Sequence, residues 1–179
     1  MLADEMRACT RCDELASTRI QVVVGSGPVD ARLVVVGEAP GAQEDETGVP
    51  FVGRSGQLLD RLLAEAGMPR DQVAVLNTVK CRPPDNRVPS RTETANCRPW
   101  TQQQLGQLAP RIVVPVGLSA TSWFLGKTTL GAVRGRVHEV DGRRVLPTFH
   151  PAAALRGGPN GVAMTTLRED LQLAVRLAS

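Results

Sequence analysis

The sequence has no tyrosine and only five aromatic residues among 179, so leucine, valine and alanine must supply the hydrophobic core. It has no apolar run close to the roughly 18 residues of a membrane span. Its acidic N-terminus, Met1 to Glu5, lacks the hydrophobic stretch of a secretory signal peptide. We therefore expect a cytoplasmic protein with no membrane partner, folded as a single domain over residues 1–179 and acting as a monomer.

Lysine is also scarce, because 19 of the 21 basic residues are arginines. Arginine binds phosphate groups through two parallel hydrogen bonds, so the composition is compatible with nucleic acid as a partner. The formal net charge of +3 is too small to indicate such a partner by itself.

Four cysteines need an explanation: Cys9 and Cys12 form a Cys-x2-Cys pair, and Cys81 and Cys97 follow much later. The cytoplasm keeps thiols reduced and a core of this size needs no disulfides, so metal binding is the better interpretation. Four thiolates can hold a tetrahedral zinc ion or a [4Fe-4S] cluster. Zinc ribbons usually repeat the tight pair, whereas fifteen residues separate Cys81 from Cys97. The spacing slightly favours iron–sulfur and leaves both metals open.

The apolar pattern predicts an α/β fold. Runs of valine and leucine without polar alternation are typical of strands covered on both faces, and they occur at residues 33–36, 73–76, 112–116 and 144–147. A helical pattern follows each of them, at residues 55–66, 92–109, 119–125 and 165–177. We also expect a helix up to Leu15 that carries Cys9 and Cys12. This alternation predicts a parallel sheet between layers of helices.

Polar residues follow all four predicted strands. Glu38, Asn77, Ser119 and His150 each lie within three residues of a strand end. Because the carboxyl ends of parallel strands share one edge of a sheet, these side chains are expected to meet there. A polar loop at one strand end is common, but a carboxylate, an amide and one of only two histidines at the same edge predict a functional site.

The segment from Gly37 to Gly56 is long for a connection in a compact domain, and such loops usually have a function. Phe51 is an unexpected aromatic residue in this polar loop. Glu46 is interpreted as a solvated charge.

Several common motifs are excluded. Gly126-Lys127-Thr128 resembles the end of a phosphate-binding loop, but Thr121 occupies the required earlier glycine position. Gly25-Ser26-Gly27 lacks the third glycine of a dinucleotide-binding motif and is interpreted as a turn. The absence of Gly-x-Ser-x-Gly and His-Glu-x-x-His motifs disfavours serine hydrolase and zinc protease chemistry.

Three motifs combine with the four cysteines. They are Gly37-Glu38-Ala39-Pro40-Gly41, continued by Glu44-Asp45 and Gly48-x-Pro50-Phe51-Val52-Gly53; Asn77-x2-Lys80-Cys81-Arg82-Pro83-Pro84; and His150-Pro151-Ala152. In this order the set resembles the family 4 uracil-DNA glycosylases, the iron–sulfur branch of the uracil-DNA glycosylase superfamily. The resemblance extends from about Cys9 to Arg156. Each motif alone is weak, but the combination is specific.

The resemblance implies a three-layer α/β/α sandwich around a four-stranded parallel sheet. It implies a base excision repair enzyme that acts on uracil-containing DNA, hydrolyses the N-glycosidic bond of uracil and leaves an abasic site. It also implies that Cys9, Cys12, Cys81 and Cys97 hold a structural [4Fe-4S] cluster. This cluster would pin the loop after Asn77 against the N-terminal helix.

The resemblance also assigns individual roles. The implied catalytic residues are Glu38, Asn77 and His150, and the implied substrate-binding residues are Glu38, Ala39, Pro40, Gly41, Phe51, Asn77 and His150. Phe51 would stack on the flipped uracil, Asn77 would read its O4 and N3–H edge, and His150 would donate a hydrogen bond to O2. Leu155, in a loop at residues 152–156, would act as a wedge in the minor groove. Arg54, Ser119 and Arg156 would contact phosphates.

Two positions depart from other branches of the superfamily. Those branches place a water-positioning aspartate where this chain has Ala39, so Glu38, or Glu44 acting through the loop, would orient the water instead. They also place a thymine-excluding tyrosine where this chain has Gly41.

Two alternative functions are weighed. A sibling branch attaches itself covalently to the abasic sugar through a histidine after the asparagine motif, but residues 82–89 contain no histidine. A catalytically silent iron–sulfur or zinc nucleic-acid-binding module would explain the cysteines and arginines. It would not explain Asn77 and His150 at adjacent strand ends.

Overall fold

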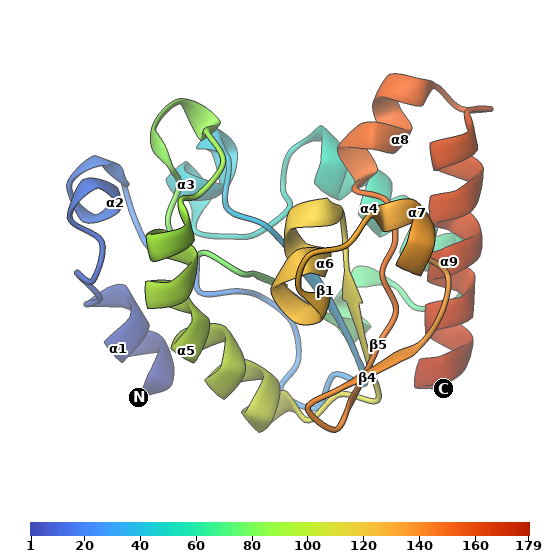
Figure 1. Ribbon diagram of the computed structural model, residues 1–179, viewed down its shortest axis with the longest axis horizontal. Helices are drawn as coiled ribbons and strands as arrows, with labels where there is room; N and C mark the ends of the chain where they lie inside the picture. The colour runs from blue at the N-terminus through green and yellow to red at the C-terminus, as the bar shows by residue number, and fades with distance from the viewer.

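The computed structural model describes all residues from 1 to 179. Its centre is a five-stranded sheet with helices on both faces (Figure 1). The strands are β1 (Leu33–Gly37), β2 (Val73–Asn77), β3 (Ile112–Pro115), β4 (His138–Val140) and β5 (Arg143–Val145). Their order in the sheet is β2-β1-β3-β5-β4, and all pairs are parallel except the antiparallel pair β4–β5.

Nine α-helices surround the sheet. They are α1 (Leu2–Arg7), α2 (Asp13–Thr18), α3 (Ala42–Thr47), α4 (Arg54–Glu65), α5 (Arg91–Leu108), α6 (Leu118–Leu125), α7 (Leu130–Val133), α8 (Pro151–Gly157) and α9 (Val162–Ala178). Two 3-10 turns, η1 (Arg70–Gln72) and η2 (Pro84–Asn86), complete the structure. None of the helices combines the length and the hydrophobicity that a membrane-spanning segment needs.

Alternate residues of β1 face the two helix layers. Leu33 and Val35 pack in one hydrophobic cluster with residues of α4 and α9, whereas Val34 and Val36 pack in another with residues of α5 and α6. Side chains alternate along a strand, so a strand covered on both faces needs apolar residues at every position. This explains the uninterrupted valine and leucine runs, and it confirms the prediction of an α/β/α sandwich.

The predicted sheet is one strand short. The four predicted parallel strands are present, but β4 adds an antiparallel edge that the sequence analysis missed. Its residues, His138 to Val140, are only partly buried or exposed, because the strand lies at the edge of the sheet. It therefore has no continuous apolar run, which was the signal used to find the other strands.

Three local predictions are also corrected. The N-terminal segment forms two helices, α1 and α2, and Cys9 and Cys12 lie at the break between them. The segment after Gly37 contains the short helix α3. Residues 152–156, expected as a loop, belong to helix α8, which has His150 as its N-cap and Pro151 at its first position. Proline suits that position because its fixed φ is already helical and its missing N–H has no helical partner to lose.

The N-terminal helices pack beside α5 and form a third hydrophobic cluster. Met6 and Leu15 meet Val79, from the segment after β2, and Trp100 of α5 in this cluster. All four cysteines belong to the cluster or pack against it. Residues that are far apart in the sequence are thus joined next to the end of β2.

Candidate active site

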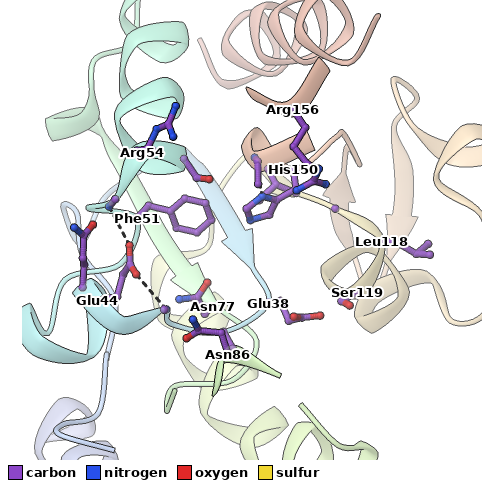
Figure 2. A pocket seen from close by; sticks show the side chains of 18 residues that line it. Glu38, Glu44, Phe51, Arg54, Asn77, Asn86, Leu118, Ser119, His150 and Arg156 are labelled. Carbon is purple, nitrogen blue, oxygen red and sulfur yellow. Dashed lines mark hydrogen bonds between the residues drawn. The ribbon is translucent and has the colours of Figure 1, made fainter. Parts of the chain in front are cut away.

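A pocket of about 970 Å³ opens at the carboxyl edge of the sheet. Residues that follow β1, β2 and β3, together with His150, contribute to its lining (Figure 2). Among the predicted site residues, the pocket is lined by Glu38, Ala39, Gly41, Phe51, Arg54, Asn77, Ser119, His150 and Arg156. Pro40 is buried and does not line the pocket. Leu155 also lies outside the lining and packs partly against the core.

Phe51 forms one wall of the pocket. It is buried, and its ring centroid lies 5.7 Å from that of His150. Its φ of 57° is unusual for a residue other than glycine, and such local strain persists only where the surrounding structure holds it. The wall depends on Gly37, because a Cβ at that position would lie 2.6 Å from the Phe51 ring and 2.5 Å from Asn77 Oδ1.

Gly37→Ala is expected to slow the uracil excision that the motifs imply by roughly tenfold or more, and to destabilise the fold by about 1–3 kcal/mol, the usual effect of overpacking. The added methyl must displace Phe51, Asn77 or both. Gly106→Ala, in α5, is the matched control because nothing lies within 4 Å of its added Cβ. Thermal unfolding and single-turnover excision would be measured for both variants. A normal excision rate in Gly37→Ala would contradict the role of Phe51 as a wall of the pocket.

Asn77 is the most buried polar residue of the pocket. It is 2% exposed, and its side-chain Oδ1 has no hydrogen-bond partner in the protein. Its backbone carbonyl accepts hydrogen bonds from Lys80 Nζ at 2.6 Å and from Thr101 Oγ1 of α5 at 3.3 Å. The main chain of Asn77 is therefore held firmly, while its amide oxygen is a buried acceptor without a partner. A buried unpaired acceptor costs about 1–3 kcal/mol, which a matching donor on that ligand would offset.

His150 is held in one orientation and one protonation state. Its Nδ1 accepts a hydrogen bond from the backbone N–H of Ala152 at 3.0 Å. A neutral imidazole with an accepting Nδ1 carries its proton on Nε2. Burial, assisted by the positive charge of Arg156, lowers the pKa of His150 below its usual value of 6.5. At neutral pH the ring is therefore uncharged and presents an Nε2–H donor.

The uracil excision that the motifs imply is therefore expected to stay constant as the pH falls to about 6.5, the usual pKa of histidine, and to decline only below it. Protonation would place a proton on Nδ1, the atom that accepts the Ala152 N–H, so two donors would then face each other. Since the folded protein binds this proton less readily than the unfolded chain, His150 also contributes stability above pH 6.5 that is lost as the pH falls toward its lowered pKa. Single-turnover rates across this range would test the assignment. An excision rate that rises with acidity would show that protonated His150 is the active form.

Glu44 fastens the loop that carries Phe51. Its Oε2 accepts the backbone N–H of Gly41 at 3.1 Å, and its Oε1 accepts those of Val52 at 3.0 Å and Gly53 at 3.1 Å. Figure 2 shows Glu44 below Phe51, with two of these bonds drawn. The carboxylate therefore has a structural task, since both oxygens are already used by main-chain donors.

The neighbouring acidic residues have different environments. Asp45 is 1% exposed and accepts the backbone N–H groups of Ile20 and Gln21, which ties the loop to the segment after α2. Glu46 is exposed, as predicted. The sequence analysis named Glu44 only as a residue that could act through the loop, and it did not predict the main-chain partners of Glu44 or Asp45.

Glu38 is the acidic side chain of the pocket without a partner in the protein. Its backbone carbonyl accepts the Thr78 hydroxyl at 2.8 Å, which fixes the main chain, whereas its carboxylate takes part in no hydrogen bond or ion pair within the protein. Asn86 also lines the pocket and was missed. It has a positive φ of 55° and accepts a hydrogen bond from Arg82 Nε at 2.8 Å.

Each of the four cysteine sulfurs accepts an N–H hydrogen bond. The donors are Trp100 Nε1 to Cys9 at 3.4 Å, Asn96 Nδ2 to Cys12 at 3.6 Å, Arg19 Nη1 to Cys81 at 3.2 Å and the Lys80 backbone N–H to Cys97 at 3.3 Å. All four thiols are free of disulfides, and burial raises the pKa of Cys97 to about 11. No three His, Cys, Asp or Glu side chains converge closely enough to hold one metal ion.

Comparison with known proteins agrees with this architecture. A sequence model of the Uracil DNA glycosylase superfamily matches residues 24–172. A Type-4 uracil-DNA glycosylase of Thermotoga maritima is 42% identical over 177 residues, which cover 97% of this chain and 91% of that protein. Type-4 uracil-DNA glycosylases of Saccharolobus solfataricus and Pyrobaculum aerophilum are 40% and 42% identical, over 89% and 87% of this chain and 78% and 83% of theirs.

These matches span most of each sequence, and the matched residues include the whole sheet and the pocket. The chain therefore belongs to the uracil DNA glycosylase superfamily, and within it to the type-4 family, as its motifs predicted.

Proposed function

We propose that this protein removes uracil from DNA by hydrolysing its N-glycosidic bond, which leaves an abasic site for base excision repair. The observation that carries the proposal is the convergence of Phe51, the unpartnered Oδ1 of Asn77 and the neutral His150 on one pocket. An aromatic face, a planar amide and a hydrogen-bond donor are what a flipped pyrimidine needs. Family membership supports the same reaction.

Asn77 would select uracil. Its free Oδ1 would accept the N3–H of uracil, and its Nδ2 would donate to O4. Cytosine presents an acceptor and a donor at these two positions, so its edge would oppose the amide at both. A buried site that is built around hydrogen bonds can reject a mismatched base by about 10⁴-fold or more. Phe51 would stack on the base after flipping, which helps to offset the lost stacking in DNA.

His150 would stabilise the leaving uracil. As the glycosidic bond breaks, negative charge develops on O2 and positive charge on the sugar. A neutral Nε2–H donor placed at O2 would bind this developing anion more strongly than the ground-state base. Such a donor is worth about 3 kcal/mol in the transition state.

Glu38 would orient the attacking water. Three main-chain N–H groups already occupy the Glu44 carboxylate, which favours Glu38 over Glu44 for this role. Glu38 lines the pocket and has a carboxylate with no partner in the protein. Its negative charge would also favour the positive charge that develops on the sugar. Glu44 would act only by holding the loop.

The pocket rim would hold the DNA. Arg54, Ser119 and Arg156 are exposed at the pocket, which suits contacts with phosphates next to the flipped nucleotide. Leu155 stays the predicted wedge, although it is partly buried in helix α8. Leu118, which precedes Ser119, is 49% exposed at the same pocket and offers a second apolar side chain to the DNA.

The four cysteines would hold a [4Fe-4S] cluster. In such a cluster each thiolate binds a different iron atom, so the sulfurs stay further apart than around one zinc ion. One N–H donor at every sulfur suits thiolates that carry negative charge. The bound cluster supplies no step of the reaction and would pin the N-terminal helices to α5.

The protein purified without oxygen is expected to be brown and to contain about four iron atoms per chain. Cys97→Ser is expected to lose the colour, the iron and a large part of its thermal stability, because three thiolates hold such a cluster poorly. Asn160→Ala, an exposed position that keeps all four thiols, is the control. A colourless wild-type protein with one zinc ion per chain would overturn the cluster assignment.

Excision from an oligonucleotide with a single uracil tests the function itself. The abasic product is cleaved by alkali and measured under single-turnover conditions, with cytosine and thymine in place of uracil as controls. Cleavage at uracil alone is expected. A folded brown protein that binds DNA and cleaves none of the three would instead favour a silent DNA-binding module. We also propose that the protein works in the cytoplasm as a monomer.

A further inference from the structure

A second groove of about 450 Å³ opens beside the uracil pocket. It lies among the segment after β2, the start of α5, and α6 with the residues that follow it. Glu38 and Ser119 line both cavities, so the groove continues from the pocket. Figure 2 shows these two residues on the side of the pocket away from Glu44.

The groove is strongly basic. Arg91, Arg98 and Lys127 line it, and the only acidic residue in its lining is Glu38, at the junction with the pocket. None of the three cations forms an ion pair. Lys127 is one of only two lysines in the chain, and the other, Lys80, is buried. Three unpaired cations in one groove favour an extended anion.

Arg98 is the one of these three cations whose side chain is held in place by neighbouring groups. Its guanidinium lies 4.0 Å from the centre of the Trp123 ring, and its Nη2 donates to the Trp123 carbonyl at 2.8 Å. A guanidinium has five N–H donors, so others remain for a ligand. Because Arg98 is already ordered, it loses little freedom when an anion binds.

We propose that this groove, named here the α5–α6 groove, binds the phosphodiester backbone on one side of the flipped uracil. The inference rests on the proposed function and extends it to a part of the substrate that the pocket does not hold. Once the uracil enters the pocket, the DNA backbone on either side of it must pass over the pocket rim. The path past Ser119 leads to Arg91, Arg98 and Lys127. Phosphate contacts there would offset part of the free energy that base flipping requires.

The salt dependence of DNA binding tests this inference. Each phosphate contact contributes about 0.9 to the slope of log affinity against log salt for duplex DNA, and about 0.7 for single strands. The double variant Arg91→Ala/Lys127→Ala is expected to lower the slope by about 1.4 to 1.8. Arg61→Ala/Arg176→Ala is the matched control: it removes the same charge from exposed positions of α4 and α9 that do not line the groove.

Truncated DNA separates the groove from a general charge effect. Uracil-containing oligonucleotides would be shortened on the 5′ side or on the 3′ side, with the other flank kept long. Wild-type affinity is expected to fall for one of these truncations, and on that DNA the groove variant should bind as well as the wild type. A slope equal to that of the control, or the same defect on every oligonucleotide, would overturn the inference. If the wild type excises uracil and the groove variant behaves normally, only the groove assignment fails; if the wild type does not excise uracil, the proposed function fails.

Discussion

Asn77→Ala is expected to slow uracil excision by about 10³-fold and to leave binding to uracil-free DNA unchanged. The variant removes two hydrogen bonds to the base, each worth about 2 kcal/mol in a buried site. The residue is 2% exposed, so water cannot easily replace the lost partner. The main-chain bonds from Lys80 and Thr101 to residue 77 do not depend on its side chain, so the local fold should persist.

The experiment compares single-turnover excision with binding to matched DNA with and without uracil. Asn160→Ala is the control, because it makes the same chemical change at an exposed position outside the pocket. An excision rate near that of the wild type would remove Asn77 from base recognition. An equal loss of binding to both DNAs would mean that the substitution had disturbed the fold.

His150→Ala is expected to slow excision by about 10²- to 10³-fold while uracil-containing DNA binds almost as tightly. A donor to the developing anion acts mainly in the transition state, so its loss lowers the rate far more than the affinity. His150→Gln offers an amide donor on a side chain of similar reach, and it should recover part of the rate.

His138→Ala is the matched control for this pair. His138 is the only other histidine, and it lies on the edge strand β4, where its Nε2 is 2.9 Å from the Val133 carbonyl oxygen. It should excise uracil at the normal rate. If His150→Ala lost as much affinity as rate, His150 would be a binding residue only.

The pocket and the cysteines share one structural support. Lys80 donates through Nζ to the Asn77 carbonyl and through its backbone N–H to Cys97. Thr101, one turn after Cys97 on α5, also donates to the Asn77 carbonyl. A cluster that pins α5 would therefore also hold the residue that reads the base. This gives the proposed cluster a physical route to the pocket without a chemical step.

Much of this protein followed from its sequence. The valine and leucine runs predicted the four parallel strands because strands covered on both faces need apolar residues at every position. Asn77 and His150 could be placed at one edge because parallel strands end together. The edge strand β4 was not predicted because it is short and half exposed. Helix α8 was taken for a loop although Pro151, followed by three alanines and a leucine, was a readable start signal.

Tertiary structure alone decided how the polar residues divide their tasks. Glu38 and Glu44 are both glutamates in the segment between β1 and α4, and their sequence positions do not distinguish a free carboxylate from one bound by three main-chain N–H groups. Nδ1 of His150 accepts a hydrogen bond because the chain turns into α8 at Ala152. Oδ1 of Asn77 is free because no donor of the protein lies within hydrogen-bond distance of it. Residue types and strand ends are local properties that a sequence records. Hydrogen-bond partners depend on how the backbone turns and packs, so only the folded chain determines which polar atoms are satisfied and which are left for a substrate.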